Sequence, residues 1–195
     1  MTQAEVIQFF DRAAPTWDAE LIVSPPVVEK ILDAARVTPG KTILDVACGT
    51  GVLLPRYLER RAASVTAIDI SPEMARLCAE KFPDPSVEVL CGDAETYPFA
   101  HTFDCVMVYN AFPHFPDPER LIGRLSALVS PGGTLTIAHG MPRSEIDRRH
   151  EGPARHVSRP LLPLEELRTL MARYLTVTTA VSDETMYQVT GLRLS

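Results

Sequence analysis

The sequence predicts an α/β fold: a doubly wound, mostly parallel seven-stranded sheet with helices on both faces and an antiparallel C-terminal strand. Short apolar runs rich in β-branched residues alternate with amphipathic helical patterns along most of the 195-residue chain, which is typical of a parallel sheet. The last two runs are joined by so short a turn that they must form an antiparallel hairpin. The length favours a single domain over residues 1–195.

The predicted elements follow one another along the whole chain. Residues 1–40 are helical in pattern and precede the first strand. Five strands are expected at Thr42–Val46, Val65–Ile70, Val87–Leu90, Phe103–Tyr109 and Thr134–His139, and a terminal hairpin at Leu175–Ser182 and Thr185–Leu194. Apolar stripes predict helices over Pro72–Phe82, Pro118–Val129 and Leu164–Tyr174. Pro39-Gly40 and Pro131-Gly132-Gly133 are expected where the chain returns from helix to strand.

Composition argues against several classes of protein. The formal net charge of −6 disfavours general attraction to nucleic acid or to anionic lipid. No apolar stretch approaches the roughly 18 residues of a membrane span, and the N-terminus lacks the basic and apolar regions of a signal peptide. The cysteines at 48, 78, 91 and 105 have no CxxC spacing, which predicts reduced, mostly buried thiols in a cytoplasmic protein. No metal ligand is assigned.

The turn after the first strand is the most informative segment. The strand ends in Asp45 and passes through Gly49 and Gly51 into a helical pattern that begins at Val52. Glycine tolerates positive φ and lets a ligand approach the backbone, while the free N–H groups of the next helix point at that ligand. A dinucleotide fingerprint needs a third glycine where Leu54 stands, which disfavours an NAD-dependent oxidoreductase. A carboxylate there would repel pyrophosphate but suits an ammonium group.

The ends of the next strands also carry polar residues. Asp69 closes the second strand about twenty residues after the loop, where a carboxylate can accept hydrogen bonds from both ribose hydroxyls. Its other role would be a negative charge at the start of the helix that opens at Ser71. The third strand runs into Asp93, which could instead stabilise a turn, and the fourth into Asn110. Because ligands of doubly wound sheets lie at these ends, one shared site is expected.

With its acid and glycines in this order, the run Asp45-Val46-Ala47-Cys48-Gly49-Thr50-Gly51 resembles the first motif of class I S-adenosylmethionine-dependent methyltransferases. The resemblance covers about residues 40–140 and is nearest to the small-molecule branch that includes the ubiquinone and menaquinone C-methyltransferases. The opening Phe9–Asp18 is similar to the N-terminal lid of that branch. Residues 1–40 are therefore expected to cap the cofactor.

The resemblance implies S-adenosylmethionine as the cofactor and assigns each motif a part of it. Asp45 is expected near the methionine amino group, Gly49 and Gly51 under the ribose and carboxylate, Asp69 on the ribose, Asp93 and Ala94 at the adenine, and Asn110 beside the transferred methyl. Ala47, Ile70, Met74 and Trp17 complete the implied set. The substrate cannot be transferred from this resemblance, because none of the substrate-side segments of the quinone enzymes is recognised.

The acceptor side depends on less specific signals. His114, four residues beyond Asn110, is the best placed base if the acceptor must lose a proton; otherwise it packs in an aromatic loop. The linker 140–162 is expected to contact substrate, and its Arg148 and Arg149 predict an anionic acceptor unless they belong to a solvated helix. His139, His150 and His156 leave open a metal-bearing or metalloid substrate.

The sequence thus predicts an enzyme that transfers a methyl group from S-adenosylmethionine to a small-molecule acceptor by in-line displacement. Two alternatives stay open: a protein that binds S-adenosylmethionine without catalysis, and a methyltransferase that acts on a metal-bearing substrate through the histidine region. Methylation of nucleic-acid amino groups is disfavoured, because Asn110-Ala111-Phe112-Pro113 departs from the Asn/Asp-Pro-Pro-aromatic motif of those enzymes. The acceptor atom and the oligomeric state are not identified.

Overall fold

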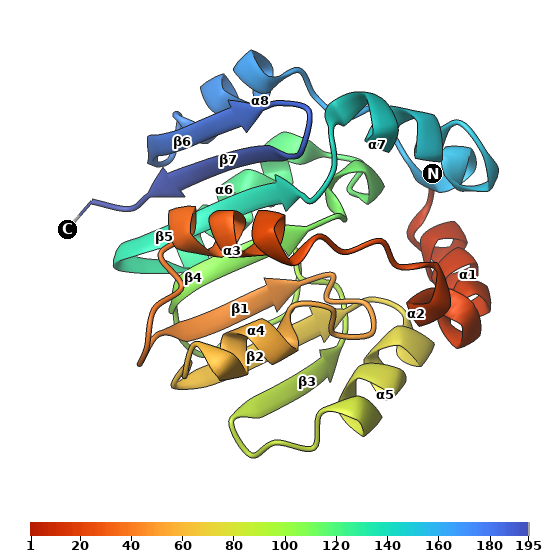
Figure 1. Ribbon diagram of the computed structural model, residues 1–195, viewed down its shortest axis with the longest axis horizontal. Helices are drawn as coiled ribbons and strands as arrows, with labels where there is room; N and C mark the ends of the chain where they lie inside the picture. The colour runs from red at the N-terminus through yellow and green to blue at the C-terminus, as the bar shows by residue number, and fades with distance from the viewer. Residues whose placement is uncertain (195) are drawn as a thin grey trace.

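Seven strands form one sheet in the order β3-β2-β1-β4-β5-β7-β6 in the computed structural model, which describes residues 1–194 (Figure 1). The strands are β1 (Thr42–Val46), β2 (Ser64–Asp69), β3 (Val87–Cys91), β4 (Phe103–Tyr109), β5 (Val129–His139), β6 (Thr176–Ser182) and β7 (Tyr187–Leu192). The first five are parallel, and β7 is antiparallel to its neighbours β5 and β6. This confirms the predicted fold class. The strand order reverses between β1 and β4.

Helices cover both faces of the sheet. One face carries α3 (Pro25–Ala34), α4 (Leu54–Glu59) and α5 (Pro72–Lys81), which lie in front in Figure 1, and the other carries α6 (Pro118–Leu128) and α8 (Leu164–Met171). Successive strand residues point to opposite faces of the sheet. Ile43 therefore packs in the core under α3 and α4, and Leu44 packs in the core under α6 and α8. Both side chains are fully buried.

A group of short helices lies at the carboxyl ends of the strands. These are α1 (Gln3–Ala13), η1 (Ala14–Thr16), α2 (Trp17–Glu20), η2 (Phe112–His114), α7 (Arg143–His150) and η3 (Pro153–Val157). The first of them begins at a capping box: the Thr2 hydroxyl accepts from the Glu5 amide (3.3 Å), and the Glu5 carboxylate accepts from the Thr2 amide (2.6 Å). Asp11, near its other end, accepts a hydrogen bond from the Ser71 hydroxyl (2.5 Å) at the start of α5.

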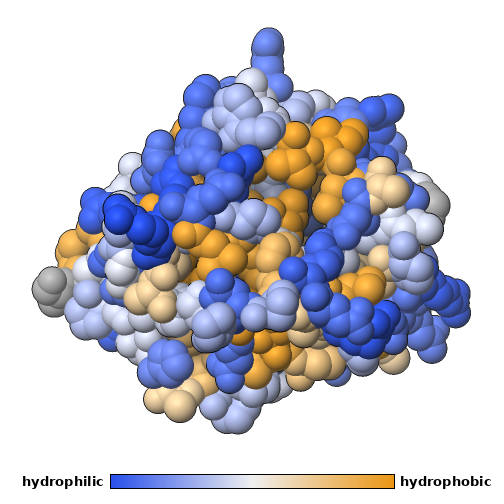
Figure 2. Space-filling model, turned by 60° about the horizontal axis from the view of Figure 1, so that its bottom comes forward, coloured by the Kyte–Doolittle hydropathy of each residue, from blue (hydrophilic) through white to orange (hydrophobic). Residues whose placement is uncertain are grey.

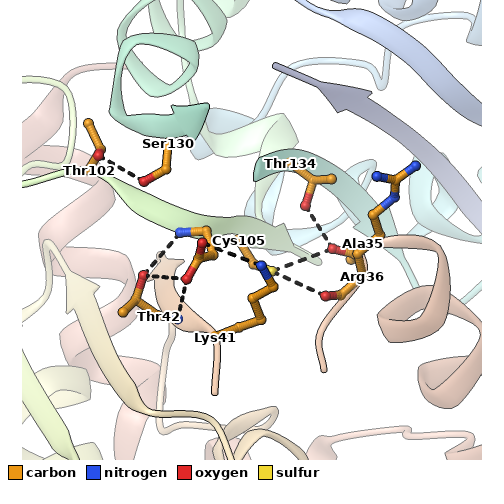
Figure 3. Close-up of polar contacts among 9 residues, drawn as sticks. Ala35, Arg36, Lys41, Thr42, Thr102, Cys105, Ser130 and Thr134 are labelled. Atoms are coloured by element: carbon orange, nitrogen blue, oxygen red, sulfur yellow. Dashed lines mark hydrogen bonds and ion pairs between the residues drawn. The ribbon is translucent and has the colours of Figure 1, made fainter. Parts of the chain in front are cut away.

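The opposite end of the sheet holds a polar network that fastens α3 to the strands (Figure 3). The Asp104 carboxylate accepts from the amide (2.9 Å) and hydroxyl (3.1 Å) of Thr42 and pairs with the Lys41 ammonium group (3.5 Å). The Thr134 hydroxyl donates to the carbonyl of Ala35 (2.7 Å), at the C-terminal end of α3. These contacts lie away from the carboxyl ends of the strands and have a structural role.

Two predicted boundaries were wrong. β5 begins at Val129 directly after α6, so Pro131-Gly132-Gly133 lies within an irregular part of the strand and not in a turn before Thr134. The amide of Gly132, at φ +77°, donates to the Arg193 carbonyl (2.8 Å). This pairing with the chain beyond β7 is long-range, so it overrides the local proline and glycine signal.

The terminal hairpin is confirmed, but its turn is longer than predicted. β7 begins at Tyr187 and not at Thr185, because Asp183 organises the turn: its carboxylate accepts from the amides of Thr185 (2.7 Å) and Met186 (2.9 Å). The other element ends match the prediction, as in β1 and β4, or differ from it by a few residues, as in α8, which ends at Met171 and not at Tyr174.

The described residues include no helix with the length and apolar character that crossing a membrane requires. Figure 2 brings the β3 edge of the sheet forward and shows hydrophobic residues in patches between hydrophilic ones.

The thiols of Cys48, Cys78 and Cys105 are buried and that of Cys91 is exposed, and all four are free.

Candidate functional site

A cavity of about 500 Å³ lies at the carboxyl ends of β1, β2, β3 and β4, with residues of α1 and α2 in its wall. The point where the strand order reverses, between β1 and β4, is where doubly wound sheets bind their ligands. Most residues of the predicted cofactor set line this cavity: Trp17, Ala47, Gly49, Asp69, Ile70, Met74, Asp93, Ala94 and Asn110. Asp45 and Gly51 do not line it.

The loop after β1 takes its shape from left-handed backbone. Ala47, Gly49 and Gly51 all have positive φ, at +55°, +55° and +88°. A Cβ on Gly51 would come within 2.7 Å of the Phe82 ring and 2.9 Å of the Cys78 sulfur, so this glycine lets the loop pack on α5. The structural requirement for Gly51 is therefore close packing beneath the loop.

Two carboxylates lie beneath and within the cavity wall. Burial, together with the negative charge of Asp69, raises the pKa of Asp45 to about 8. Burial also raises the pKa of Asp69 to about 6, although its oxygens accept from the amides of Ser71 (2.9 Å) and Gly49 (2.8 Å). Asp69 thus braces the glycine loop and the start of α5. A bound cation would stabilise the ionised form of both carboxyl groups.

The ends of β3 and β4 are fixed by side-chain hydrogen bonds. Asp93 accepts from the Glu95 amide (2.9 Å) and from the side-chain amide of Gln3 in α1 (3.1 Å). Asn110 has a left-handed backbone at φ +54°, and its side-chain oxygen accepts from the Gly140 amide (3.0 Å) after β5. The latter bond joins the two strand ends beside the cavity.

The segment α1–α2, which the sequence predicts to be a lid, lines the cavity and is fastened to the loop after β1. The Trp17 nitrogen would lie 3.6 Å from a Cβ on Gly49. The neighbouring Asp18 accepts from the Thr50 hydroxyl (2.5 Å) and pairs with Lys81 of α5 (2.7 Å). The lid therefore contacts the same loop that carries the first motif.

His114 lines the cavity with one ring nitrogen engaged on the protein side. Its Nδ1 lies 2.9 Å from the Val157 carbonyl oxygen and 3.2 Å from the Ser158 hydroxyl. Because a carbonyl oxygen can only accept, we assign the proton of the neutral ring to Nδ1, which leaves Nε2 with a free lone pair. Burial, with a smaller effect of the nearby His150, lowers the pKa of His114 to about 4, although the hydrogen bond with the Val157 carbonyl opposes this. The ring is therefore neutral near pH 7.

The predicted substrate residues of the linker lie outside this cavity. Arg148 and Arg149 are exposed on α7 and pair with Glu145 at 2.6 and 3.7 Å. His156 is exposed and packs against the Phe9 ring of α1, with ring centroids 5.8 Å apart. The structure does not bring these three residues together with the cofactor set.

The other two predicted histidines, His139 and His150, lie near His114. His139 is buried at the end of β5, and burial lowers its pKa to about 3. His150 lies with its ring centroid 5.1 Å from that of His114, and its Nδ1 is 2.7 Å from the Ile146 carbonyl oxygen. Within residues 1–194, no three or more His, Cys, Asp or Glu side chains are grouped so that they could hold a metal ion.

Several cavity residues were missed by the sequence analysis. Gln3, Leu21 and Tyr109 line the wall, and Asp18 holds the lid, but none was assigned to the site. The Thr-x-x-Glu capping box at Thr2 predicts where α1 begins and would have put Gln3 in its first turn. Contacts such as that of Asp18 with the loop depend on the tertiary fold, and the sequence carried no signal for them.

Comparison with known proteins adds independent findings. Residues 44–137 match the family described as methyltransferase domain. Ubiquinone biosynthesis O-methyltransferase from Xanthomonas campestris pv. campestris is 33% identical over 145 residues, which cover 70% of this chain and 60% of that relative. Demethylmenaquinone methyltransferase from Renibacterium salmoninarum is 30% identical over 140 residues, covering 69% of this chain and 58% of the relative. The chain thus spans less than two thirds of the length of these relatives.

Among solved structures, the N-methyltransferase NodS from Bradyrhizobium japonicum, in complex with S-adenosyl-L-homocysteine, has a TM-score of 0.73. The match covers 97% of this chain and 99% of NodS at 15% sequence identity. At this identity the likeness shows a shared fold.

Proposed function

The chain belongs to the class I S-adenosylmethionine-dependent methyltransferases, and on that premise we propose that it transfers a methyl group from S-adenosylmethionine to a small-molecule acceptor by in-line displacement. One observation carries the proposal. The cavity at the reversal of strand order is lined by the residues that follow β1, β2, β3 and β4, and all four strand ends fall within the family match at 44–137.

The acids in and beneath the cavity wall fit this cofactor in charge. S-adenosylmethionine carries an ammonium and a sulfonium group. Asp45 and Asp69 are buried acids whose pKa values are raised by burial, so a bound positive charge would stabilise their ionised forms. Asp93, Ala94, Gly49 and the other lining residues of the predicted set would hold the remaining parts. These assignments are part of the proposal.

The chemistry asks little of the protein beyond positioning. The cofactor supplies a methyl group that is already activated on a sulfonium. The chain's own residues would orient the acceptor and exclude water, which the lid over the cavity supports. Where the acceptor loses a proton, His114 Nε2 would take it, because that nitrogen has a free lone pair and its ring is held in place through Nδ1.

Replacement of Asp69 by Ala tests the cofactor assignment. We expect at least about a tenfold loss of S-adenosylmethionine affinity in calorimetry, because charge-assisted hydrogen bonds are worth roughly 1.5–3 kcal/mol. Glu184→Ala, an exposed acid in the β6–β7 turn, is the control. Unchanged affinity in Asp69→Ala would remove the ribose assignment.

Replacement of His114 by Gln separates catalysis from binding. We expect S-adenosylmethionine affinity within about twofold of the parent and slower transfer of labelled methyl to fractions of a small-molecule extract, with the loss mainly in kcat. A protein that only binds S-adenosylmethionine would label no fraction, whichever residue stands at 114. That outcome would contradict the proposed activity while leaving the cofactor site intact.

A further inference from the structure

We propose that the β4 side of the cavity is an acceptor compartment, formed by Phe10, Trp17, Leu21 and His114, that selects an uncharged and largely apolar molecule carrying a hydrogen-bond donor. The inference rests on the proposed function and deepens it by naming the class of acceptor. It also competes directly with the expectation that Arg148 and Arg149 recognise an anionic acceptor.

Charge is distributed unevenly around the cavity. In the sheet, β2 and β3 lie on one side of β1 and β4 lies on the other. The carboxylates in the wall, Asp69, Asp93 and Glu95, all follow β2 or β3. The cation Arg120 also lines the wall, but it pairs with Glu95 (3.2 Å) and so belongs to this charged half. The charged side chains of this half of the cavity suit a charged cofactor.

The other half presents aromatic and aliphatic surface. The Phe10 ring meets both neighbours edge to face, with centroids 5.6 Å from Trp17 and 4.9 Å from His114. The three rings form a continuous wall from the loop after β1 to the segment after β4, because Trp17 lies against Gly49 and His114 belongs to η2. Leu21 also lines the cavity. A flat apolar molecule buries most surface against such a wall.

The polar group of this compartment selects a neutral donor. His114 is uncharged, and its Nε2 accepts a hydrogen bond, so a hydroxyl or N–H group satisfies it while a carboxylate does not. An anionic acceptor would meet no side-chain cation among Phe10, Trp17, Leu21 and His114, and burying an unpaired charge is costly. The arginines of α7 are outside, paired with Glu145.

The segment after Leu21 is also apolar. α2 ends at Glu20, Leu21 lines the cavity, and the two residues that follow it are exposed, Ile22 at 63% and Val23 at 41%. Exposed aliphatic side chains next to the compartment in the chain favour the approach of an apolar acceptor over that of an ionic one.

The test compares three probes of equal ring size on protein saturated with S-adenosyl-L-homocysteine, by calorimetry: 4-ethylphenol, 4-ethylbenzoate and 4-ethylbenzylamine. We expect 4-ethylphenol to bind at least about tenfold more tightly than the anion or the cation, because only the neutral donor avoids an unpaired buried charge. Tighter binding of the benzoate or of the amine would overturn the proposal, as would no binding of the phenol.

Two variants and a control locate the effect. Phe10→Ala should weaken 4-ethylphenol binding at least about fivefold through lost ring contact. Leu21→Arg, at the edge of a loop where folding is not at stake, should shift the preference towards 4-ethylbenzoate by supplying the missing cation. The double variant Arg148→Ala/Arg149→Ala should leave all three affinities within about twofold. Loss of benzoate binding in that double variant would favour the linker as the acceptor site.

The affinity for S-adenosyl-L-homocysteine is measured first for every protein. If the parent does not bind it, the proposed function fails. If it binds and the phenol is not preferred, the acceptor compartment alone is wrong.

Discussion

Asp45 and Asp69, which we propose hold the cofactor, are buried acids whose charged forms destabilise the free protein. Their folded-state pKa values of about 8 and about 6 lie above the value near 4 that a carboxyl has in an unfolded chain. Between those values the folded protein holds more protons than the unfolded chain. These two groups therefore make stability fall as pH rises through that window.

Replacing Asp45 by Asn should stabilise the protein in the absence of ligand. The change removes a buried acid and keeps its shape, so we expect the free energy of unfolding to rise by on the order of 2 kcal/mol near pH 8. The gain should vanish near pH 3, below the pKa of both states, where the carboxyl is protonated in the folded and the unfolded chain. Denaturant unfolding at the two pH values measures this, with Glu184→Gln as a surface control. An equal gain at both pH values would contradict the electrostatic cause.

The same variant should weaken S-adenosylmethionine binding, because the proposed partner of the ammonium group is gone. Stabilisation of the free protein together with loss of affinity is the combined result expected of a carboxylate kept for its ligand.

At the scale of elements, the predicted lid contacts three parts of the proposed cofactor site, each through a polar contact of its own. Gln3 donates to Asp93 after β3, Asp11 accepts from Ser71 at the start of α5, and Asp18 accepts from Thr50 after β1. Only Val6 of α1 is buried, and α2 has no buried residue. A segment that buries so few of its own side chains can open at little energetic cost.

Trp17 should report on this lid, since it is the only tryptophan and lines the cavity. We expect S-adenosyl-L-homocysteine to change its fluorescence. Asp18→Ala removes the contacts to Thr50 and Lys81, so Trp17 should become more accessible to a soluble quencher in the free protein, and ligand affinity should fall about threefold. Glu20→Ala, exposed on the same short helix, is the control. Fluorescence that ignores the ligand would contradict a lid that orders over it.

The sequence predicted elements well where one local signal dominates. Short apolar runs rich in β-branched residues marked β1 and β4 to the residue, and an apolar stripe marked α5 within one residue. It failed at β5, where pairing with the chain after β7 extends the strand through a proline and two glycines. The left-handed backbone of Ala47 and Asn110 was equally invisible, because neither residue type requires positive φ.

At the scale of the whole molecule, the two ends of the sheet have different tasks. The carboxyl ends of the strands hold the cavity, and the amino ends hold the network of Lys41, Thr42, Asp104 and Thr134 (Figure 3). Most of the predicted cofactor residues that line the cavity could be located from sequence because they lie at or just after the end of a predicted strand. The proposed acceptor compartment was only partly visible: His114 was singled out by its place after β4, but its contact with Phe10 and the position of Leu21 depend on the tertiary fold.

Replacing Asp104 by Ala should therefore reduce stability and leave the site unaffected. Burial raises the pKa of Asp104, but hydrogen bonds from Thr42 and the charge of Lys41 outweigh this and lower it overall. Because the folded-state pKa is depressed, the stabilisation is present above about pH 4 and is lost as pH falls through the folded-state pKa. We expect a loss of about 1–2 kcal/mol at pH 7.

Asp45→Asn provides a comparison for this prediction. As pH rises from 3 to 8, the change in the free energy of unfolding should become more favourable in Asp45→Asn and more unfavourable in Asp104→Ala. S-adenosylmethionine affinity of Asp104→Ala should stay within about twofold of the parent. A large loss of affinity would show that the two ends of the sheet are coupled.

The position of β7 between β5 and β6 has a consequence for how the protein is made. During synthesis β6 leaves the ribosome before the strand that must join it to β5, so β5 keeps an unpaired edge until Tyr187–Leu192 have emerged. Strands β1 to β4 can pair earlier, since all four precede β5 in the chain. The nascent chain can therefore pair β1 to β4, whose ends surround the cavity, before the sheet is completed by insertion of β7. Until that insertion, the exposed edge of β5 can pair with other chains.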